Sequence, residues 1–208
     1  MESVTTTYKH KIVFMGNISV GKTSLINRYV HGGFIEEYQP TVGIDFVTKS
    51  IPIPEKSLNL QLQLWDTAGQ EKYQSVIPIY IKDSTISIVV FDLTETKSFD
   101  TVQKWVEEIK SIRGENAEVL LVGNKSDLKD LRKVTKEDAD KKIGELKLPK
   151  YYEISAKTGD GISTLFEDVV KILSDKLPEK VAEDAEKINP YNDHTPHEGT
   201  TKNGKCGC

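Results

Sequence analysis

The sequence predicts an α/β fold: a mostly parallel sheet of six strands, with one antiparallel strand and with helices on both faces. Short apolar runs alternate along the chain with segments of helical periodicity, a pattern typical of parallel sheets. The first run ends at Gly16 in a glycine-containing loop, and a helical pattern begins directly after it. Two further runs, 45–51 and 58–64, are separated only by a short turn, which favours an antiparallel pair.

The six predicted strands differ in how their apolar residues are spaced. The strand at 58–64 alternates leucine with polar residues, as a strand with one buried face does, and 45–51 is its predicted partner. The runs 86–91 and 119–122 are mainly apolar, which is typical of strands buried on both faces. In chain order, the predicted strands are 11–15, 45–51, 58–64, 86–91, 119–122 and 151–154, with Pro52, Pro54 and Ser57 in the antiparallel turn.

Apolar residues recur at helical spacing between and after these strands. A helical pattern over 22–30 follows the first strand. Thr135 and Asp138 have the spacing of a capping box, which would begin a helix that runs to Leu146. Two further helices each have an apolar face, formed by Phe99, Val102, Val106 and Ile109 and by Ile162, Leu165, Phe166, Val169, Ile172 and Leu173.

The composition fits one globular domain with a tail. Of the 208 residues, 37% are hydrophobic and 29% are charged. We assign a domain to 9–176 and expect a disordered tail over 177–208, because large apolar residues become rare there. A net charge of −4 argues against nucleic-acid binding, which needs a basic field. No apolar run resembles a signal peptide or a membrane span, so we expect a chain made in the cytosol that stays soluble unless modified.

The segment between the first strand and the first helix reads Gly16-Asn-Ile-Ser-Val-Gly-Lys-Thr23. It matches the phosphate-loop pattern G-x-x-x-x-G-K-S/T, in which glycines let backbone N–H groups surround an anion at a helix N-terminus. Lys22 would reach the β- and γ-phosphates, and the Thr23 hydroxyl would bind magnesium. The alternative is an ordinary glycine turn. The predicted nucleotide contacts here are Gly16, Asn17, Ile18, Ser19, Val20, Gly21, Lys22, Thr23 and Ser24.

A second motif, Asn124-Lys-Ser-Asp127, follows the buried strand at 119–122. The Asp127 carboxylate can accept hydrogen bonds from N1 and the 2-amino group of guanine, whereas adenine lacks both donors. Alone, this tetrapeptide is also compatible with a polar turn, and the phosphate loop alone would also suit an ATPase or a nucleoside kinase. Together the two motifs predict a guanine-nucleotide site.

Three more motifs stand in the order and spacing of a known family. They are Tyr38-Gln-Pro-Thr41-Val-Gly, Asp66-Thr-Ala-Gly-Gln70 and Ser155-Ala-Lys157. With the two motifs above, they make residues 9–176 resemble the Ras superfamily of small GTPases, whose fold is the P-loop NTPase small G domain. The resemblance implies that Thr41 closes on magnesium when a γ-phosphate is present, that Asp66 supports magnesium through water, and that the Gly69 amide touches the γ-phosphate.

The resemblance also implies roles at the base and in catalysis. Phe34 would pack against the guanine edge, the Lys125 stem would lie over the ring, and the Ala156 amide would bond the guanine oxygen. Gln70 would orient the attacking water while Lys22 and magnesium stabilise the developing charge. No arginine finger is evident in cis, so hydrolysis should be slow and depend on a GTPase-activating protein, which contributes about 10³ to 10⁵ in rate. The resemblance further implies that four more residues contact the nucleotide: Tyr38, Asn124, Ser155 and Lys157.

Within the superfamily, the chain resembles the Rab family through Ile44-Asp-Phe46, Leu60-Gln-Leu-Gln-Leu-Trp65-Asp-Thr-Ala-Gly-Gln-Glu71 and a double-cysteine tail. The segment 65–92 is most similar to the Golgi-associated branch that serves retrograde transport. This resemblance implies an effector-binding surface made of Ile44, Phe46, Trp65 and Tyr80. The alternative is that the three aromatic side chains only pack between strands.

Ile18 departs from the family pattern, because Ras proteins have glycine and Golgi Rab proteins have glutamine at this position. A branched apolar side chain here could crowd Gln70 or an incoming catalytic group. Two hypotheses about turnover therefore stand: an active GTPase switch, and a GTP-bound scaffold with little intrinsic turnover.

The two cysteines, Cys206 and Cys208, stand where a disulfide or a zinc ion would organise no fold. They resemble the Rab signal for geranylgeranylation of both cysteines, and two lipid chains anchor a protein more stably than one. The alternative is two unmodified thiols. We expect a monomer on the cytoplasmic face of Golgi membranes, with a cytosolic pool when GDP is bound. The partners implied are an exchange factor, a GTPase-activating protein, a GDP-dissociation inhibitor, an escort protein and effectors.

Overall fold

The computed structural model describes residues 6–34, 41, 44–67 and 76–177, and the structural statements below refer to these residues. The chain divides into a first unit, Met1–Pro178, and a second, Glu179–Cys208. The helices and strands described here belong to the first unit. The predicted tail, except for Leu177, lies outside the described residues, so the domain limits and the disorder of the tail stay predictions.

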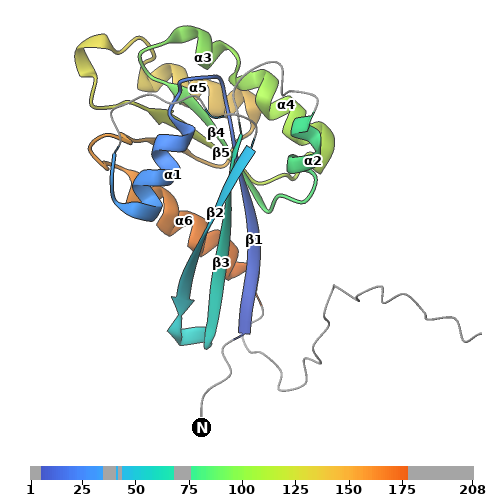
Figure 1. The fold of residues 1–208 in the computed structure, drawn as a ribbon. Coiled ribbons are helices and arrows are strands. Elements are labelled where there is room, and N and C mark those ends of the chain that lie inside the picture. Colours follow the sequence, from blue (N-terminus) through green and yellow to red (C-terminus); the bar gives the residue numbers. More distant parts are fainter. Residues whose placement is uncertain (1–5, 35–40, 42–43, 68–75, 178–208) are drawn as a thin grey trace, which may run out of the picture. The chain divides into compact units, whose positions relative to one another are not determined.

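A six-stranded sheet forms the centre of the first unit, in the order β2-β3-β1-β4-β5-β6 (Figure 1). Neighbouring strands are parallel except β2 and β3, which pair antiparallel at one edge. This arrangement confirms the predicted fold class. The strands are β1 (Thr6–Met15), β2 (Ile44–Ile53), β3 (Leu58–Thr67), β4 (Ile86–Asp92), β5 (Val119–Asn124) and β6 (Tyr151–Glu153).

Helices cover both faces of the sheet, as predicted (Figure 1). Successive side chains of β1 point to opposite faces, so Ile12 and Phe14 pack in the core cluster under α1 and α6, while Val13 and Met15 pack in the cluster under α2 and α4. The helices are α1 (Lys22–His31), η1 (Pro54–Lys56), α2 (Ile77–Ile81), α3 (Thr96–Asp100), α4 (Val102–Arg113), η3 (Lys129–Leu131), α5 (Lys136–Leu146) and α6 (Ile162–Asp175).

The structure differs from the predicted elements in several places. Phe99 was predicted on one helical face with Val102, Val106 and Ile109, but it lies in α3, and the other three lie in α4. Strand β1 begins at Thr6 rather than at residue 11, because its polar first half pairs with β3 from Thr6 opposite Leu58 onward. Pro52 lies inside β2 rather than in the turn. A proline is tolerated there because β2 is an edge strand, which leaves one side of its backbone unpaired.

The predicted capping box before α5 is confirmed. The Asp138 backbone N–H donates to Thr135 Oγ1 at 3.1 Å, and the Thr135 N–H donates to Asp138 Oδ2 at 3.1 Å. Two N–H groups that the first helical turn leaves unpaired are satisfied in this way. The start of α5 is therefore fixed by two local side chains.

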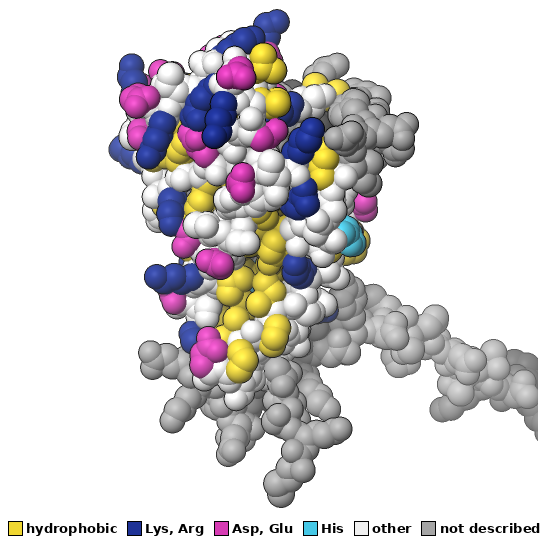
Figure 2. Space-filling view, turned by 90° about the vertical axis from the view of Figure 1, so that its left-hand side faces the viewer, with side chains coloured by type: hydrophobic (Ala, Val, Ile, Leu, Met, Phe, Trp, Pro, Cys, Tyr) yellow, Lys and Arg dark blue, Asp and Glu magenta, His cyan; other side chains and the backbone are white. Residues whose placement is uncertain are grey.

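Charges of both signs are interspersed on the face of the molecule shown in Figure 2. A nucleic-acid interface would instead gather Lys and Arg on one face. Among the described residues, no helix is both long enough and apolar enough to cross a bilayer.

Candidate nucleotide-binding site

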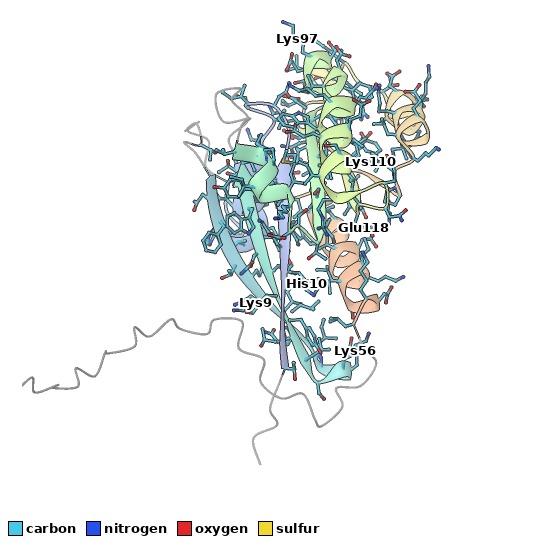
Figure 3. All side chains as sticks on the ribbon, turned by 90° about the vertical axis from the view of Figure 1, so that its right-hand side faces the viewer. Lys9, His10, Lys56, Lys97, Lys110 and Glu118 are labelled. Carbon is cyan, nitrogen blue, oxygen red and sulfur yellow. The ribbon has the colours of Figure 1, made fainter. Side chains whose placement is uncertain are left out.

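The predicted phosphate and base motifs meet at the carboxyl ends of the parallel strands. The loop 16–21 joins β1 to α1, and Asn124 ends β5. Lys97, in α3 after β4, marks this end of the molecule in Figure 3, and Lys56, in η1, marks the opposite end. In α/β folds, phosphate-bearing ligands bind at this edge of the sheet, beside a helix N-terminus.

Two glycines let the loop before α1 pass close to neighbouring strands. A Cβ atom on Gly16 would lie 2.2 Å from the Val90 carbonyl oxygen, and one on Gly21 would lie 2.3 Å from Asn124 Nδ2. Both glycines also have a positive φ, at 139° and 94°. A larger residue at either position would clash and be strained, so this backbone path requires glycine.

Lys22, the first residue of α1, is buried with 6% of its surface exposed. Its ammonium donates to the carbonyl oxygens of Gly16 and Asn17, both at 2.9 Å. Burial lowers the pKa of Lys22 to about 8, against the opposing effect of the Asp66 charge. An ammonium has three donors, so after these two bonds one donor remains for an anion in the loop.

Three oxygen-bearing side chains meet beside Lys22. The Thr23 and Thr41 hydroxyl oxygens lie 2.8 Å apart, and Thr23 Oγ1 donates to Asp66 Oδ2 at 2.5 Å. Asp66 Oδ1 is buried without a hydrogen-bond partner among the described residues. Burial raises the pKa of Asp66, although its bonds to Thr23 and the Lys22 charge oppose the rise.

This oxygen cluster fits magnesium, which prefers hard oxygen ligands and commonly binds one or two carboxylates together with phosphate and water. The unpartnered Asp66 Oδ1 is a buried acceptor that a water ligand of the metal would satisfy. The described residues contain no group of three or more His, Cys, Asp or Glu side chains that could hold a metal ion. Thr23, Thr41 and Asp66 are thus the residues that would hold magnesium, and that role stays a prediction.

The base motif is built from the ends of β5 and β6. Asn124 Nδ2 donates to the Val20 carbonyl oxygen at 2.8 Å, and Asn124 Oδ1 accepts the Ala156 N–H at 3.0 Å. Asp127 Oδ1 accepts the Ser155 hydroxyl at 2.6 Å. Asn124 therefore ties the phosphate loop to the base loop, while Ser155 orients the carboxylate predicted to read guanine. The predicted bond from the Ala156 amide to the guanine oxygen stays a prediction.

A phosphate loop, a magnesium-type oxygen cluster and a base loop thus share one end of the sheet. A sequence profile of the Ras family matches residues 11–175. This protein belongs to the Ras family. Ras-family members are small GTPases, which generally bind GTP or GDP with magnesium and respond to exchange factors, activating proteins and effectors. Family membership therefore argues against the ATPase and nucleoside kinase alternatives.

The base loop of this Ras-family domain contains an ion pair that the sequence motifs did not reveal. Lys125 Nζ lies 2.5 Å from Asp92 Oδ2. Asp92 is the last residue of β4, whereas Lys125 directly follows β5, the neighbouring strand. A carboxylate at the carboxyl end of a buried strand was the available signal, because such ends line ligand sites in parallel sheets.

Arg28 of α1 is a second residue that the motifs did not reveal. Its Nε donates to the Ala156 carbonyl oxygen at 2.9 Å, one terminal nitrogen donates to the Gly32 carbonyl oxygen at 2.7 Å, and the other donates to the Lys157 carbonyl oxygen. One guanidinium therefore joins the C-terminal end of α1 to the loop after β6. Nothing in the local sequence indicates a contact between residues 128 positions apart.

The phosphate loop is also held from α4. Asn17 Oδ1 accepts hydrogen bonds from Thr101 Oγ1 at 2.9 Å and from Trp105 Nε1 at 3.0 Å. The Asn17 carbonyl oxygen is one of the two that bind Lys22. Thr101 and Trp105 therefore fix the side chain of the same residue whose backbone holds the lysine.

The predicted effector surface is a real aromatic cluster on β2, β3 and α2. The Phe46 and Trp65 rings stack with centroids 4.9 Å apart, and the Tyr80 ring lies 5.5 Å from Trp65. Lys11 Nζ lies 4.6 Å from the Trp65 ring centroid. Phe46 is 51% exposed, so the cluster reaches the surface. Phe46 and Trp65 are also paired across β2 and β3, as the inter-strand packing alternative expects, and the effector role stays a prediction.

Several predicted residues lie outside the described part of the chain, or have side chains that do. They are Tyr38, Ile44 (side chain), Gly69, Gln70, Cys206 and Cys208. Phe34 is described, and it packs half-buried against the core cluster under α1 and α6. The roles predicted for these residues stay predictions.

Proposed function

We propose that this protein is a Rab-type GTPase that recruits effectors to Golgi membranes in its GTP-bound state. The switch in this proposal is best supported by the cluster of Thr23, Thr41 and Asp66, and the Rab and Golgi parts rest on the sequence resemblance. Thr41 is 18 residues from Thr23 along the chain, yet their hydroxyls are 2.8 Å apart. A loop residue placed on the magnesium ligands would sense whether a γ-phosphate is present, which is what a nucleotide switch requires.

The described residues support a hydrolysis step that relies on positioning and charge. Lys22 would stabilise the charge that develops on the phosphate oxygens, and Thr23 and Asp66 would fix the metal-ligand geometry. Bound magnesium would supply neutralisation of phosphate charge. Gln70 is proposed to orient the attacking water, in line with its place in the Asp66-Thr-Ala-Gly-Gln70 motif.

The test measures state-dependent recruitment with the full chain. Thr41→Ala should leave GDP affinity within about twofold, because GDP lacks the γ-phosphate on which Thr41 is proposed to close. It should abolish the preference of captured effectors for the GTP-loaded protein. Ser50→Ala, an exposed change on β2, is the matched control. Equal capture of the GTP and GDP forms by the wild-type protein would contradict the proposal.

Membrane attachment is proposed to depend on two prenyl groups at Cys206 and Cys208. Removal of residues 206–208 should release the protein from membranes while nucleotide affinity stays unchanged. Continued pelleting with membranes would contradict this part of the proposal. Imaging of the lipidated protein in intact cells tests the Golgi location separately.

A GTP-bound scaffold with little turnover is the second candidate, and Ile18 favours it. Ile18 is 49% exposed on the phosphate loop, so it lies at the surface of the loop and not in the core. In single-turnover hydrolysis, Ile18→Gly should be faster than wild type if this side chain crowds the catalytic groups. An unchanged rate would show that Ile18 does not limit turnover. Turnover measured with and without a GTPase-activating protein then separates the scaffold from the active switch.

A further inference from the structure

Asp92 is a buried carboxylate that is locked in place at the end of β4. Its side chain is 9% exposed. Asp92 Oδ1 accepts hydrogen bonds from the Thr94 N–H at 2.8 Å and from the Thr94 hydroxyl at 2.7 Å. The Asp92 backbone N–H donates to Ser98 Oγ at 2.9 Å. Both the backbone and one carboxylate oxygen are therefore fixed, and the other oxygen, Oδ2, points to a single cation.

That cation is Lys125, whose backbone is also fixed. Lys125 has a φ of 68°, a left-handed conformation that is uncommon for a side-chain-bearing residue. Its carbonyl oxygen accepts the Leu128 N–H at 3.0 Å, and the neighbouring Asn124 is buried and hydrogen-bonded. With the backbone fixed at one end and Nζ fixed by Asp92 at the other, the four-carbon stem is held along one path.

We propose that Asp92 is a positioning residue, which holds the Lys125 stem where it covers the guanine ring. This inference rests on the proposed guanine-nucleotide site. A free lysine side chain loses much rotamer freedom when it is immobilised on a ligand. Here the ion pair with Asp92 orders the Lys125 stem before the nucleotide binds. The loss of side-chain entropy therefore does not reduce the affinity for the nucleotide. The pair also neutralises the ammonium, which lets an uncharged ring lie against the stem.

The contribution of Asp92 to nucleotide affinity should not depend on the number of phosphates or on which base is bound. Lys125 contacts the base side of the site, so GDP and GTP should be affected equally. Asp127 reads the 2-amino group, so the preference for GDP over IDP, which lacks that group, should not change. These two expectations separate positioning of the lysine from general damage to the site.

The experiment is a double-mutant cycle on the full chain, with dissociation of fluorescent mant-GDP as the readout. Asp92→Asn should accelerate dissociation by about tenfold, the scale of a lost charge-assisted hydrogen bond. Lys125→Met keeps an unbranched apolar stem and removes the charge. The double variant should dissociate no faster than Lys125→Met alone, because Asp92 acts through that lysine. Glu95→Gln, the same chemical change at an exposed carboxylate nearby, should match wild type.

Additive effects in the cycle, or a changed ratio of GDP to IDP dissociation rates in Asp92→Asn, would overturn the inference and leave the proposed function intact. A wild-type protein that binds no guanine nucleotide would overturn both. Because Asp92→Asn could impair folding, Thr94→Val provides a milder test. It removes one hydroxyl donor to Asp92 at nearly constant shape and should accelerate dissociation by about threefold. An unchanged rate in a folded Thr94→Val protein would also overturn the inference.

Discussion

The phosphate side and the base side of the site each contain a lysine, and the two are held in opposite ways. Lys22 is buried and bonded to two uncharged carbonyl oxygens. Lys125 is partly exposed and paired with the carboxylate of Asp92. The difference follows the charge of what each would bind. Phosphate is anionic and can neutralise Lys22, whereas guanine is neutral and cannot neutralise Lys125.

This contrast predicts different physics at the two ends of one nucleotide. On the phosphate side, the buried ammonium of Lys22 is only partly compensated by carbonyl oxygens. It should therefore attract phosphate strongly, and this attraction should depend on pH. On the base side, the charge is already paired, so affinity should come from hydrogen bonds and from contact with an ordered stem. Variants at each end therefore test whether the two halves act separately.

Lys22→Met should have the largest effect. Loss of one partner of a buried charged pair costs about 3 to 5 kcal/mol, so GDP affinity should fall by about 10² to 4 × 10³. Isothermal titration of the magnesium-loaded protein measures it. Lys97→Met removes an exposed lysine at the same end of the molecule and should bind like wild type (Figure 3). If Lys22→Met lowered GDP affinity by less than fivefold, the phosphate-binding role assigned to Lys22 would be wrong.

Asp127→Asn should come next, with a loss of about a hundredfold for GDP, because the amide presents a donor to guanine donors. The same amide matches xanthine, which has an oxygen in place of the 2-amino group, so XDP should bind better than GDP. Competition between the two nucleotides measures this preference. If the variant still prefers GDP, Asp127 does not read the base.

The sequence motifs identify the groups that would touch the nucleotide but miss the residues that hold those groups. Gly16, Gly21 and Lys22 stand in one short pattern, and the structure places them in a loop whose close contacts only glycine allows. Asn17 and Trp105 are 88 residues apart. Their contact depends on how α4 packs on the sheet, which no local pattern records.

The same reasoning applies to the fold. The alternating apolar residues in 58–64 predicted a strand, and the short turn between it and 45–51 predicted the antiparallel pairing, which is confirmed. The start of β1 at Thr6 was missed because its first residues are polar, and only pairing with β3 makes them a strand. The residues at which a strand begins and ends therefore depend on long-range pairing, which local periodicity does not record.

Alkaline pH should weaken nucleotide binding by about tenfold between pH 7 and pH 9. The pKa of Lys22 is lowered to about 8 by burial, so above that pH the ligand-free lysine is mostly neutral and must take up a proton to bind phosphate. Folding of the ligand-free protein responds in the opposite direction. The unfolded lysine keeps its proton up to its ordinary pKa near 10.5, so its contribution to stability should increase as pH rises from about 8 to 10.5.

Parallel titrations of wild type and Lys22→Met separate this effect from other ionisations. GDP dissociation constants at pH 7, 8 and 9 give the slope for each protein. The wild-type slope should exceed that of the variant, since only wild type contains the shifted lysine. Identical slopes would show that another group is responsible.

The smallest expected effect concerns the support of the phosphate loop by α4. Trp105→Phe removes the indole donor to Asn17 Oδ1 and keeps a ring, and Asn17→Leu removes the acceptor for both Trp105 and Thr101. One neutral hydrogen bond contributes about 1 kcal/mol, so Trp105→Phe should accelerate GDP dissociation by about fivefold, and Asn17→Leu by more. Mant-GDP release measures both effects. If Asn17→Leu also matched wild type, the phosphate loop would be held by its glycines and Lys22 alone. The two halves of the site would then differ in their need for distant support as well as in how their lysines are held.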